Sequence, residues 1–219
     1  MSLHLIYGGT FDPIHTGHLA IACAARDSLD CTVHLMPAGD PPHRAMPGAD
    51  GATRAAMVAL AIEGVPGLVL DRRELERQGR SYTVDTLAEL RDELGPSKPL
   101  AWLVGADSLL GLPGWRRWRE LFALAHLVVA ERPGSALDAA LPAQLADALQ
   151  DRWTRQVGDL QSQPAGRVFR LHQPLSHVSA TAVRACLAAG AAIGDALPPA
   201  VAAFIQEKGL YGAAARAPL

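Results

Sequence analysis

The sequence predicts an α/β protein built on an open, doubly wound parallel sheet. Short apolar runs of strand length alternate with longer segments that carry apolar residues at helical spacing. The chain opens with a strand, a turn, a helix and a second strand, an order that requires parallel strands. Its most unusual residues follow directly after predicted strands, where open parallel sheets bind their ligands.

The first strand–helix–strand unit is the clearest part of the pattern. The first strand is predicted at residues 3–7, an apolar run that ends at Gly8 and Gly9. A helix is predicted at residues 16–29, and a second strand at residues 32–36. The apolar residues on the predicted helix face are Leu19, Ala22, Cys23 and Leu29.

The alternation continues along the chain. Further strands are predicted at residues 68–70, 100–104, 126–130 and 168–171. Further helices are predicted at residues 52–63, 83–94, 115–125, 181–189 and 199–208. Residues 135–165 indicate one alanine-rich helix followed by a polar linker, and the mixed charges of residues 71–80 are typical of a surface loop. The arginine-rich residues 116–119 are interpreted as a solvated helix face.

Length and composition predict one globular domain over residues 1–219. The chain has 219 residues, a hydrophobic fraction of 49% and a formal net charge of −2. A chain of this length buries roughly 70% of its unfolded surface, which is enough for one self-sufficient core. The hydrophobic fraction excludes a largely disordered chain, and the small net charge argues against a protein that coats nucleic acid or an anionic membrane.

The cysteines and the N-terminus predict a cytoplasmic protein. Cys23, Cys31 and Cys186 are odd in number and show no CxxC spacing, so we expect reduced thiols rather than a zinc site or a disulfide framework. The first ten residues contain no basic segment and no cleavage site of a signal peptide. No apolar stretch reaches the length of a membrane span.

The motif GGTFDPIHTGH at residues 8–18 follows the first predicted strand and opens the first predicted helix. Gly8 and Gly9 let the backbone approach a ligand, and the N-terminus of the helix presents N–H groups and a positive dipole end to phosphate. His15 and His18 lie three residues apart on the same helix face, so both can donate Nε2–H hydrogen bonds to one anion. The absence of a following Gly-Lys-Ser/Thr excludes a Walker loop.

Two histidines at this spacing can also chelate a metal ion, with Asp12 as the one candidate for a third ligand. The motif resembles the signature of the HxGH nucleotidyltransferases, which transfer a nucleoside monophosphate from a triphosphate to a phosphate-bearing acceptor. Class I aminoacyl-tRNA synthetases carry a related element, so this motif alone leaves both families open. The resemblance to the nucleotidyltransferases implies their Rossmann-like fold and makes phosphate, not metal, the expected ligand of the histidines.

A second motif, SATAVR at residues 179–184, opens a predicted helix near the C-terminus. Ser179 or Thr181 can cap this helix, and Arg184 on its first turn can fork onto phosphate oxygens. The motif resembles the S/T-x-x-R phosphate element of the same nucleotidyltransferases. A synthetase would carry a lysine-rich loop here, and this chain has only two lysines, neither of them in such a loop.

The middle of the chain holds candidate residues for the rest of the substrates. Asp107, two residues after Gly105, suits a ribose diol, with a helix N-cap as the alternative interpretation. Trp115 can stack on a flat ring or pack in the core. Tyr82 and Thr83 open a predicted helix whose N–H groups suit an anion.

Together with PPHR at residues 41–44 and the closing residues 197–211, these motifs resemble one branch of the family. That branch consists of bacterial adenylyltransferases that act on nicotinate mononucleotide. The resemblance covers almost the whole chain and is weakest over residues 135–165. Arg44 departs from the family pattern, which usually carries lysine there; the charge is kept but the geometry of the fork differs.

The resemblance implies that AMP passes from ATP to nicotinate mononucleotide, which yields nicotinate adenine dinucleotide and pyrophosphate. It implies Mg²⁺ bound mainly through ATP, without a protein metal cage, and no nucleic-acid or membrane partner; a monomer and a homo-oligomer stay open. Residues 179–211 are expected to complete the ATP site. The alternatives are an adenylyltransferase for nicotinamide mononucleotide or phosphopantetheine, and a module that senses ATP without chemistry.

The resemblance also implies the roles of individual residues. The expected catalytic residues are His15, His18 and Arg184. The expected ATP- or phosphate-binding residues are Gly8, Gly9, Thr10, Phe11, Gly105, Asp107, Arg132, Ser179 and Thr181. The expected residues for nicotinate mononucleotide are Arg44, Tyr82, Thr83 and Trp115.

Overall fold

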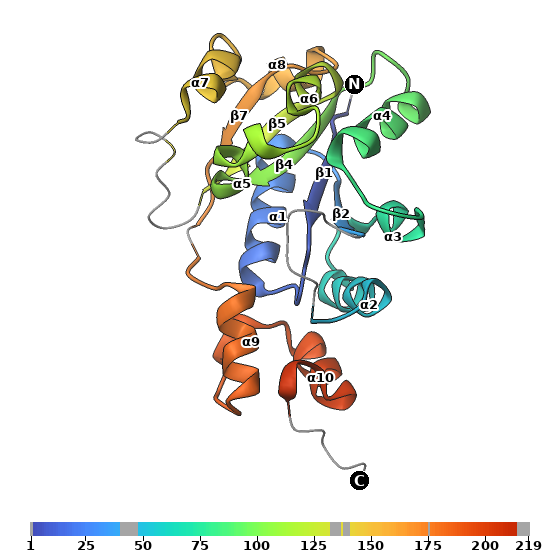
Figure 1. Ribbon diagram of the computed structural model, residues 1–219, viewed down its shortest axis with the longest axis vertical. Coiled ribbons are helices and arrows are strands. Elements are labelled where there is room, and N and C mark those ends of the chain that lie inside the picture. Colours follow the sequence, from blue (N-terminus) through green and yellow to red (C-terminus); the bar gives the residue numbers. More distant parts are fainter. Residues whose placement is uncertain (1, 40–47, 132–136, 138–140, 175, 214–219) are drawn as a thin grey trace.

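The computed structural model describes residues 2–39, 48–131, 137, 141–174 and 176–213. Its strands form a seven-stranded sheet in the order β3-β2-β1-β4-β5-β7-β6, and every neighbouring pair is parallel (Figure 1). The strands are β1 (His4–Gly9), β2 (Val33–Pro37), β3 (Leu68–Leu70), β4 (Leu100–Gly105), β5 (His126–Ala130), β6 (Trp153–Thr154) and β7 (Val168–Leu171). The predicted open parallel sheet is therefore confirmed.

Helices connect the parallel strands, as right-handed crossovers require. The helices are α1 (Thr16–Leu29), α2 (Gly51–Ile62), α3 (Arg73–Glu76), α4 (Thr83–Leu94), α5 (Ala106–Leu110), α6 (Leu121–Leu124), α7 (Ala143–Leu149), α8 (Val157–Ser162), α9 (Ala180–Ala188) and α10 (Pro199–Lys208). Short 3₁₀ turns are η1 (Leu112–Gly114), η2 (Trp118–Glu120), η3 (Gly194–Ala196) and η4 (Leu210–Gly212). No helix in the described part of the chain is long and apolar enough to cross a membrane.

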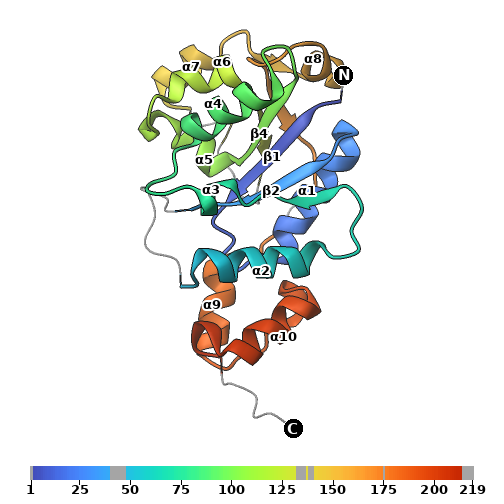
Figure 2. The ribbon, with the colours of Figure 1, turned by 90° about the vertical axis from the view of Figure 1, so that its right-hand side faces the viewer.

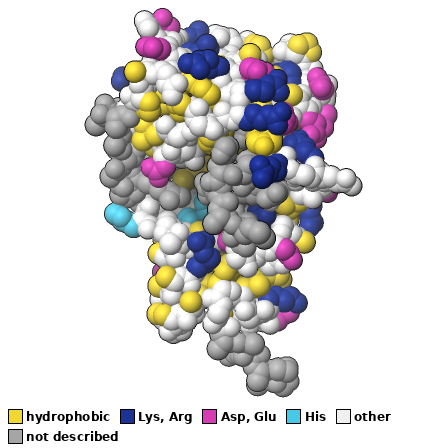
Figure 3. Space-filling view, in the orientation of Figure 1, with side chains coloured by type: hydrophobic (Ala, Val, Ile, Leu, Met, Phe, Trp, Pro, Cys, Tyr) yellow, Lys and Arg dark blue, Asp and Glu magenta, His cyan; other side chains and the backbone are white. Residues whose placement is uncertain are grey.

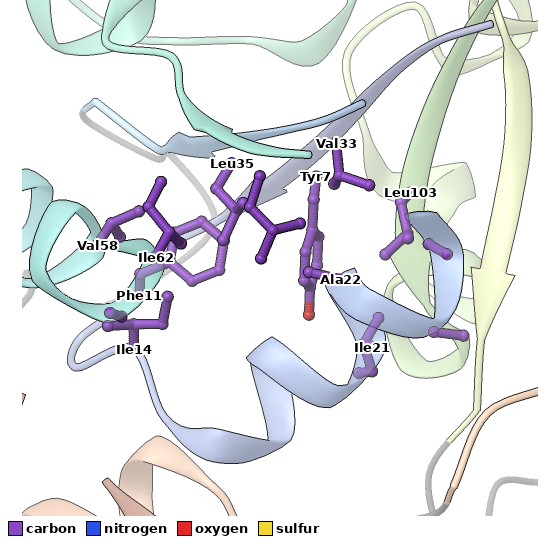
Figure 4. Close-up of a cluster of buried hydrophobic side chains, with 14 of the residues drawn as sticks. Tyr7, Phe11, Ile14, Ile21, Ala22, Val33, Leu35, Val58, Ile62 and Leu103 are labelled. Carbon is purple, nitrogen blue, oxygen red and sulfur yellow. The ribbon is translucent and has the colours of Figure 1, made fainter. Parts of the chain in front are cut away.

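Two hydrophobic cores lie on the two faces of the sheet. Side chains alternate along each strand, so Leu5 and Tyr7 of β1 belong to one core and Ile6 to the other. Helices α1, α2, α9 and α10 cover the first face, and α4 to α7 cover the second. Figure 4 shows part of the first core, where Phe11 and Leu35 lie beside Val58 and Ile62 of α2, and Tyr7 lies beside Ala22 of α1. Each fully buried aliphatic side chain contributes about 1.5–3 kcal/mol to stability.

The buried stripe of α1 differs from the predicted one. It consists of Ile21, Ala22, Ala25 and Leu29, together with Gly17. Leu19 and Cys23 are only half-buried at its border. The buried face of α1 is therefore rotated slightly around the helix axis from the predicted face. The predicted bounds of the helix are correct.

The continuous helix predicted at residues 115–125 is wrong. Trp115 has an extended backbone, and Arg117 adopts left-handed angles with φ of 51°. The segment is divided into η1, η2 and α6. The break lets Trp118 enter the second core at 6% exposure while Trp115 lines a cavity.

Two segments of low sequence periodicity also contain more structure than predicted. The predicted surface loop at residues 71–80 holds α3, whose Glu74 is only 6% exposed. Residues 135–165 hold α7, the edge strand β6 and α8 rather than one helix and a linker. These elements are short, and they depend on tertiary contacts more than on a periodic pattern of their own.

The chain order places the functional loops together. After β1 the chain adds β2 and β3 on one side and then returns to place β4 beside β1 on the other. The loops after β1 and β4 therefore diverge at the switch point of the sheet, where open parallel sheets bind ligands. Figures 1 and 2 show α9 and α10 beyond this end of β1, at the opposite end of the molecule from the N-terminus.

Candidate functional site

Two cavities lie side by side at the switch point. The larger one, of about 460 Å³, extends toward α4 and η1. The smaller one, of about 350 Å³, extends toward α1 and α9. We call them the acceptor cavity and the nucleotide cavity, after the ligands that the sequence analysis expects for the residues around each. They share a wall made of Gly8, Gly9, Thr10, Gly105, Asp107 and Ser108. In Figure 3 this face of the molecule is hollowed at mid-height, with histidine side chains near the hollow.

The glycines of the shared wall are required by close packing. A Cβ on Gly8 would lie 2.3 Å from the Trp102 ring, and one on Gly9 would lie 2.9 Å from the Phe11 ring. A side chain at either position would have to displace one of these rings, and the glycines leave the backbone itself as the wall between the two cavities. Gly105, at the start of α5, has no such neighbour and simply opens the opposite side of the wall.

His15 and His18 stand at the start of α1 with stacked rings, whose centroids are 3.7 Å apart. The backbone N–H of His15 donates to Nδ1 of His18 over 3.3 Å. Because Nδ1 is an acceptor, the neutral ring of His18 carries its proton on Nε2 and can donate there. Both residues line the nucleotide cavity, although His15 is only 2% exposed.

Phe11 lines the nucleotide cavity and also packs against His18. Its ring is 2% exposed, and it meets the rings of Tyr7 and His18 edge to face at 5.5 and 5.0 Å. It has a positive φ of 50°, an uncommon conformation for a bulky residue. The aromatic packing around Phe11 therefore fixes the orientation of His18.

Asp12 joins three segments of the chain behind the nucleotide cavity. Its carboxylate accepts hydrogen bonds from the backbone N–H of Gly48 at 2.7 Å, the N–H of Ala49 at 3.1 Å and the hydroxyl of Tyr211 at 2.7 Å. Burial, followed by the hydrogen bond to Asp12, raises the pKa of the Tyr211 hydroxyl. The C-terminal segment is thus attached directly to the loop after β1.

Arg184 reaches the same point from α9. Its Nη1 donates to the backbone oxygen of Asp12 over 2.7 Å and lies 3.8 Å from Asp12 Oδ2. Ser179 caps α9, since its hydroxyl accepts from the N–H of Ala182 at 3.2 Å. Arg184 is the fifth residue of α9, so the prediction that it lies on the first turn is wrong. Ser179, Thr181 and Arg184 all line the nucleotide cavity.

Asp107 lies on the shared wall with an exposed side chain. The alternative interpretation of Asp107 as an N-cap is wrong, because Gly105 is the N-cap of α5 and Asp107 is its second residue. An exposed carboxylate between the two cavities is well placed to accept hydrogen bonds from ligand hydroxyl groups.

Tyr82, Thr83 and Trp115, which the sequence analysis expects to contact nicotinate mononucleotide, line the acceptor cavity together. Tyr82 is the N-cap residue of α4 and Thr83 is its first residue, so the first N–H groups of this helix border the cavity. Trp115 is half-buried against the second core and offers a flat aromatic surface. This wall suits a flat ring that carries an anionic group.

Glu74 is a cavity residue that the sequence analysis missed. Its carboxylate accepts from the hydroxyl of Thr86 at 2.9 Å and from the N–H of Gly39 at 3.3 Å. Burial raises the pKa of Glu74, and these two hydrogen bonds act in the opposite direction. Glu74 thereby connects α4 to the loop after β2. Its place in a segment of mixed charge gave no signal of burial.

Arg54 on α2 was also missed. It is 1% exposed, and burial lowers its pKa. Its guanidinium donates to the carbonyl oxygens of Thr10 at 2.7 Å and Ala38 at 2.8 Å, and also to those of Gly39 and Ala49. One side chain therefore holds together the loops after β1 and β2. The sequence does not distinguish a buried arginine with this role from an arginine on the solvent-exposed face of a helix.

Two predicted site residues, Arg44 and Arg132, lie outside the described residues. Within the described part of the chain, no group of three or more His, Cys, Asp and Glu side chains is arranged to hold a metal ion. The predicted residues that the structure describes otherwise gather around the two cavities.

A family model described as "Cytidylyltransferase-like" matches residues 6–186. A "Probable nicotinate-nucleotide adenylyltransferase" of Stenotrophomonas maltophilia (strain K279a) is 59% identical over 216 residues, covering 96% of this chain and 97% of the relative. A protein of the same name from Xylella fastidiosa (strain 9a5c) is 46% identical over 215 residues, with the same two shares of coverage.

The solved structure of a Plasmodium falciparum nicotinic acid mononucleotide adenylyltransferase complexed with NaAD has the same fold. It matches 97% of this chain and 98% of its own with a TM-score of 0.71, at 17% sequence identity. The relatives at high identity and the family model together determine the family. This chain belongs to the cytidylyltransferase-like family and, within it, to the nicotinate-nucleotide adenylyltransferases.

Proposed function

We propose that the nucleotide cavity binds ATP, that the acceptor cavity binds nicotinate mononucleotide, and that the chain transfers AMP from the first to the second. The observation that carries this proposal is the shared wall of Gly8, Gly9 and Thr10, because ligands bound in the two cavities would meet there. The neighbouring structures from Plasmodium falciparum are complexes with NaAD and with APC, which supports ligands of these two kinds.

The nucleophile in this reaction is the phosphate of nicotinate mononucleotide. Its second pKa is about 6, so at pH 7 it is mostly a dianion and needs no general base. A phosphate oxygen forms a bond to the α-phosphorus of ATP, and the bond from that phosphorus to the bridging oxygen of the β-phosphate breaks. The electron pair leaves with pyrophosphate. Catalysis then consists of holding two polyanions in line and stabilising the charge on the transferred group.

The roles of the chain's residues follow from where they lie. In this proposal the backbone of Gly9 and Thr10 contacts the transferred phosphoryl group at the shared wall, and His18 donates to that group from Nε2. His15 supports His18 through the stacked rings and the backbone hydrogen bond. Arg184 neutralises the leaving pyrophosphate from the other side of the nucleotide cavity.

The remaining residues at the nucleotide cavity bind rather than react. Ser179 and Thr181 offer hydroxyl groups to the same phosphates as Arg184. Gly105 and Asp107 take the ribose, with the Asp107 carboxylate accepting from its hydroxyl groups. Residues 179–211 complete the ATP site within a single domain, and the bond from Tyr211 to Asp12 supports that role.

Mg²⁺ fits this site as an ion that arrives with ATP. Mg²⁺ prefers oxygen ligands and usually keeps several waters, so ATP oxygens can hold it without a dedicated group of side chains. When bound, the ion neutralises negative charge on the phosphate oxygens.

We also propose a cytoplasmic location, since Cys23, Cys31 and Cys186 are all free thiols, as is usual in a reducing compartment.

A pyrophosphate-release assay tests the proposal. The purified protein is mixed with ATP, Mg²⁺ and one acceptor at a time: nicotinate mononucleotide, nicotinamide mononucleotide or phosphopantetheine. We expect release to require an acceptor and to be fastest with nicotinate mononucleotide. Preference for phosphopantetheine would contradict the assigned acceptor, and binding of ATP without release for any acceptor would contradict catalysis.

A further inference from the structure

Arg116 is the one Lys or Arg among the described residues that line the acceptor cavity. The other charged side chains of that lining are the carboxylates of Glu74 and Asp107. Nicotinate mononucleotide carries a phosphate dianion and a carboxylate, and among the described residues of this lining Arg116 is the one lysine or arginine of opposite charge. We propose that the Arg116 guanidinium binds the pyridine carboxylate and sets the preference for the acid acceptor over its amide. This inference rests on the proposed function.

The structure separates the arginines of residues 116–119, which the sequence suggested were one solvated face. Arg117 forms ion pairs with Glu120 and, at 3.5 Å, with Asp85. The guanidinium of Arg119 lies over the ring of Trp118 at 4.3 Å from its centroid. Neither side chain lines the acceptor cavity. Arg116 is exposed and makes no ion pair with any residue that the structure describes.

Tyr82 holds Arg116 at the cavity. The guanidinium carbon lies 4.7 Å from the centroid of the Tyr82 ring. A contact with one aromatic ring leaves N–H donors of the guanidinium available, and two of them can form a forked pair of hydrogen bonds to a carboxylate. Tyr82 is also the N-cap residue of α4, so the same place offers the first backbone N–H groups of that helix.

The geometry also decides which end of the acceptor Arg116 meets. The reacting phosphate must lie at the wall that the two cavities share. Arg116, Tyr82 and Trp115 line the acceptor cavity and are not part of the nucleotide cavity. They therefore surround the end of the acceptor that carries the pyridine ring and its carboxylate.

A guanidinium at this position discriminates by its hydrogen-bonding chemistry. It has five N–H donors and no acceptor. A carboxylate accepts two of these donors at once, whereas the NH₂ group of an amide would face donors with nothing to accept its own hydrogens. The cationic pyridine ring and the phosphate are common to both acceptors, so they contribute little to the difference.

The test compares Arg116→Ala with Arg119→Ala, a matched loss of an exposed arginine three residues away. The kcat/KM values for nicotinate and nicotinamide mononucleotide are measured for both variants and for the wild type. We expect Arg116→Ala to reduce the acid-to-amide ratio roughly tenfold, mainly through the KM of the acid, as for loss of one charge-assisted contact. Arg119→Ala should leave the acid-to-amide ratio unchanged. The ratio for Arg116→Lys should lie between those of the wild type and Arg116→Ala.

An equal loss for both acceptors in Arg116→Ala would overturn the inference, since it would mean contact with the shared phosphate. An unchanged ratio would overturn it too. Either result would leave the proposed function standing as long as the wild type makes the dinucleotide from the acid. Thermal unfolding checks the fold of each variant, and Arg116→Gln, which keeps the length of the side chain, replaces Arg116→Ala if that variant is unstable.

Discussion

Arg184 donates a hydrogen bond over 2.7 Å to the backbone oxygen of Asp12, which lies 172 residues earlier in the chain. Asp12 follows β1 and precedes the two histidines of α1, whereas Arg184 belongs to α9 near the C-terminus. The contact therefore fixes the position of a cation relative to the N-terminus of α1. One N–H group of Arg184 is used in this way, and the guanidinium has others for phosphate oxygens.

The first prediction concerns His18. We expect His18→Ala to lower kcat by about two to three orders of magnitude, because a lost donor to the transition state costs about 3–4 kcal/mol in comparable sites. The dissociation constant of ATP should change far less. Steady-state kinetics with a separate ATP-binding titration measure both quantities. His177→Ala, which removes an exposed histidine, is the control, and a kcat near the wild-type value for His18→Ala would refute the role of His18.

The second prediction concerns Arg184. We expect Arg184→Ala to raise the KM for ATP about tenfold or more and to leave the KM for the acceptor little changed, since a charge-assisted contact contributes about 1.5–3 kcal/mol. Arg184→Lys keeps the charge but loses the fork, and it should recover part of the effect. If neither the KM for ATP nor kcat responds, Arg184 only tethers α9 to Asp12.

The third prediction concerns Tyr211. Its hydroxyl donates to the buried Asp12 carboxylate over 2.7 Å, and a hydrogen bond to a charged group contributes about 1.5–3 kcal/mol. We expect Tyr211→Phe to lower the free energy of unfolding by about that amount in a urea titration. Lys208→Ala, an exposed change in the same segment, should alter it by less than about 0.5 kcal/mol. Equal stability of Tyr211→Phe and the wild type would contradict the proposed attachment of the C-terminal segment.

The fourth prediction concerns pH. Burial, and next the nearby ring of His34, lower the pKa of His4 to about 4. The two ring centroids are 4.1 Å apart. The unfolded chain takes up this proton near pH 6.5, so between pH 6.5 and 4 it binds more protons at His4 than the folded chain does. Stability contributed by neutral His4 is therefore complete above pH 6.5 and declines as the pH falls toward 4.

The ring of His4 is only partly buried, so we discount the full shift and expect a loss of about 1–2 kcal/mol from this group. Urea titrations at several pH values between 4 and 7 measure it. His4→Gln should have a flatter dependence on pH, and His172→Gln, which removes an exposed histidine, should retain the wild-type slope. Identical slopes for His4→Gln and the wild type would contradict the assignment.

The sequence predicted the regular elements well because their signals are local. The strands at residues 68–70, 126–130 and 168–171 have the predicted bounds. So do the helices at residues 16–29, 83–94 and 199–208. Apolar periodicity and punctuation by glycine and proline depend only on neighbouring residues, so they can be recognised without the fold.

The features that the sequence did not predict depend on contacts between distant segments. In the sequence, for example, Arg54 is simply one residue of a predicted helix. Only the fold brings its guanidinium within hydrogen-bond distance of four carbonyl oxygens. In the sequence, Arg116 is one residue of an arginine-rich run. In the structure, the left-handed backbone conformation of Arg117 directs the side chains of that run to different places. The same limit applies to Glu74, whose burial comes from Thr86 and Gly39 rather than from α3 itself.

The most direct test of the account is a competition for the acceptor cavity. The wild-type protein is given ATP and equal concentrations of nicotinate and nicotinamide mononucleotide, and the two dinucleotide products are separated and measured. Their initial ratio equals the ratio of the two kcat/KM values, whatever the KM of each acceptor. We expect nicotinate adenine dinucleotide to be the dominant product. Equal amounts of the two dinucleotides would contradict the assignment of nicotinate mononucleotide as the acceptor.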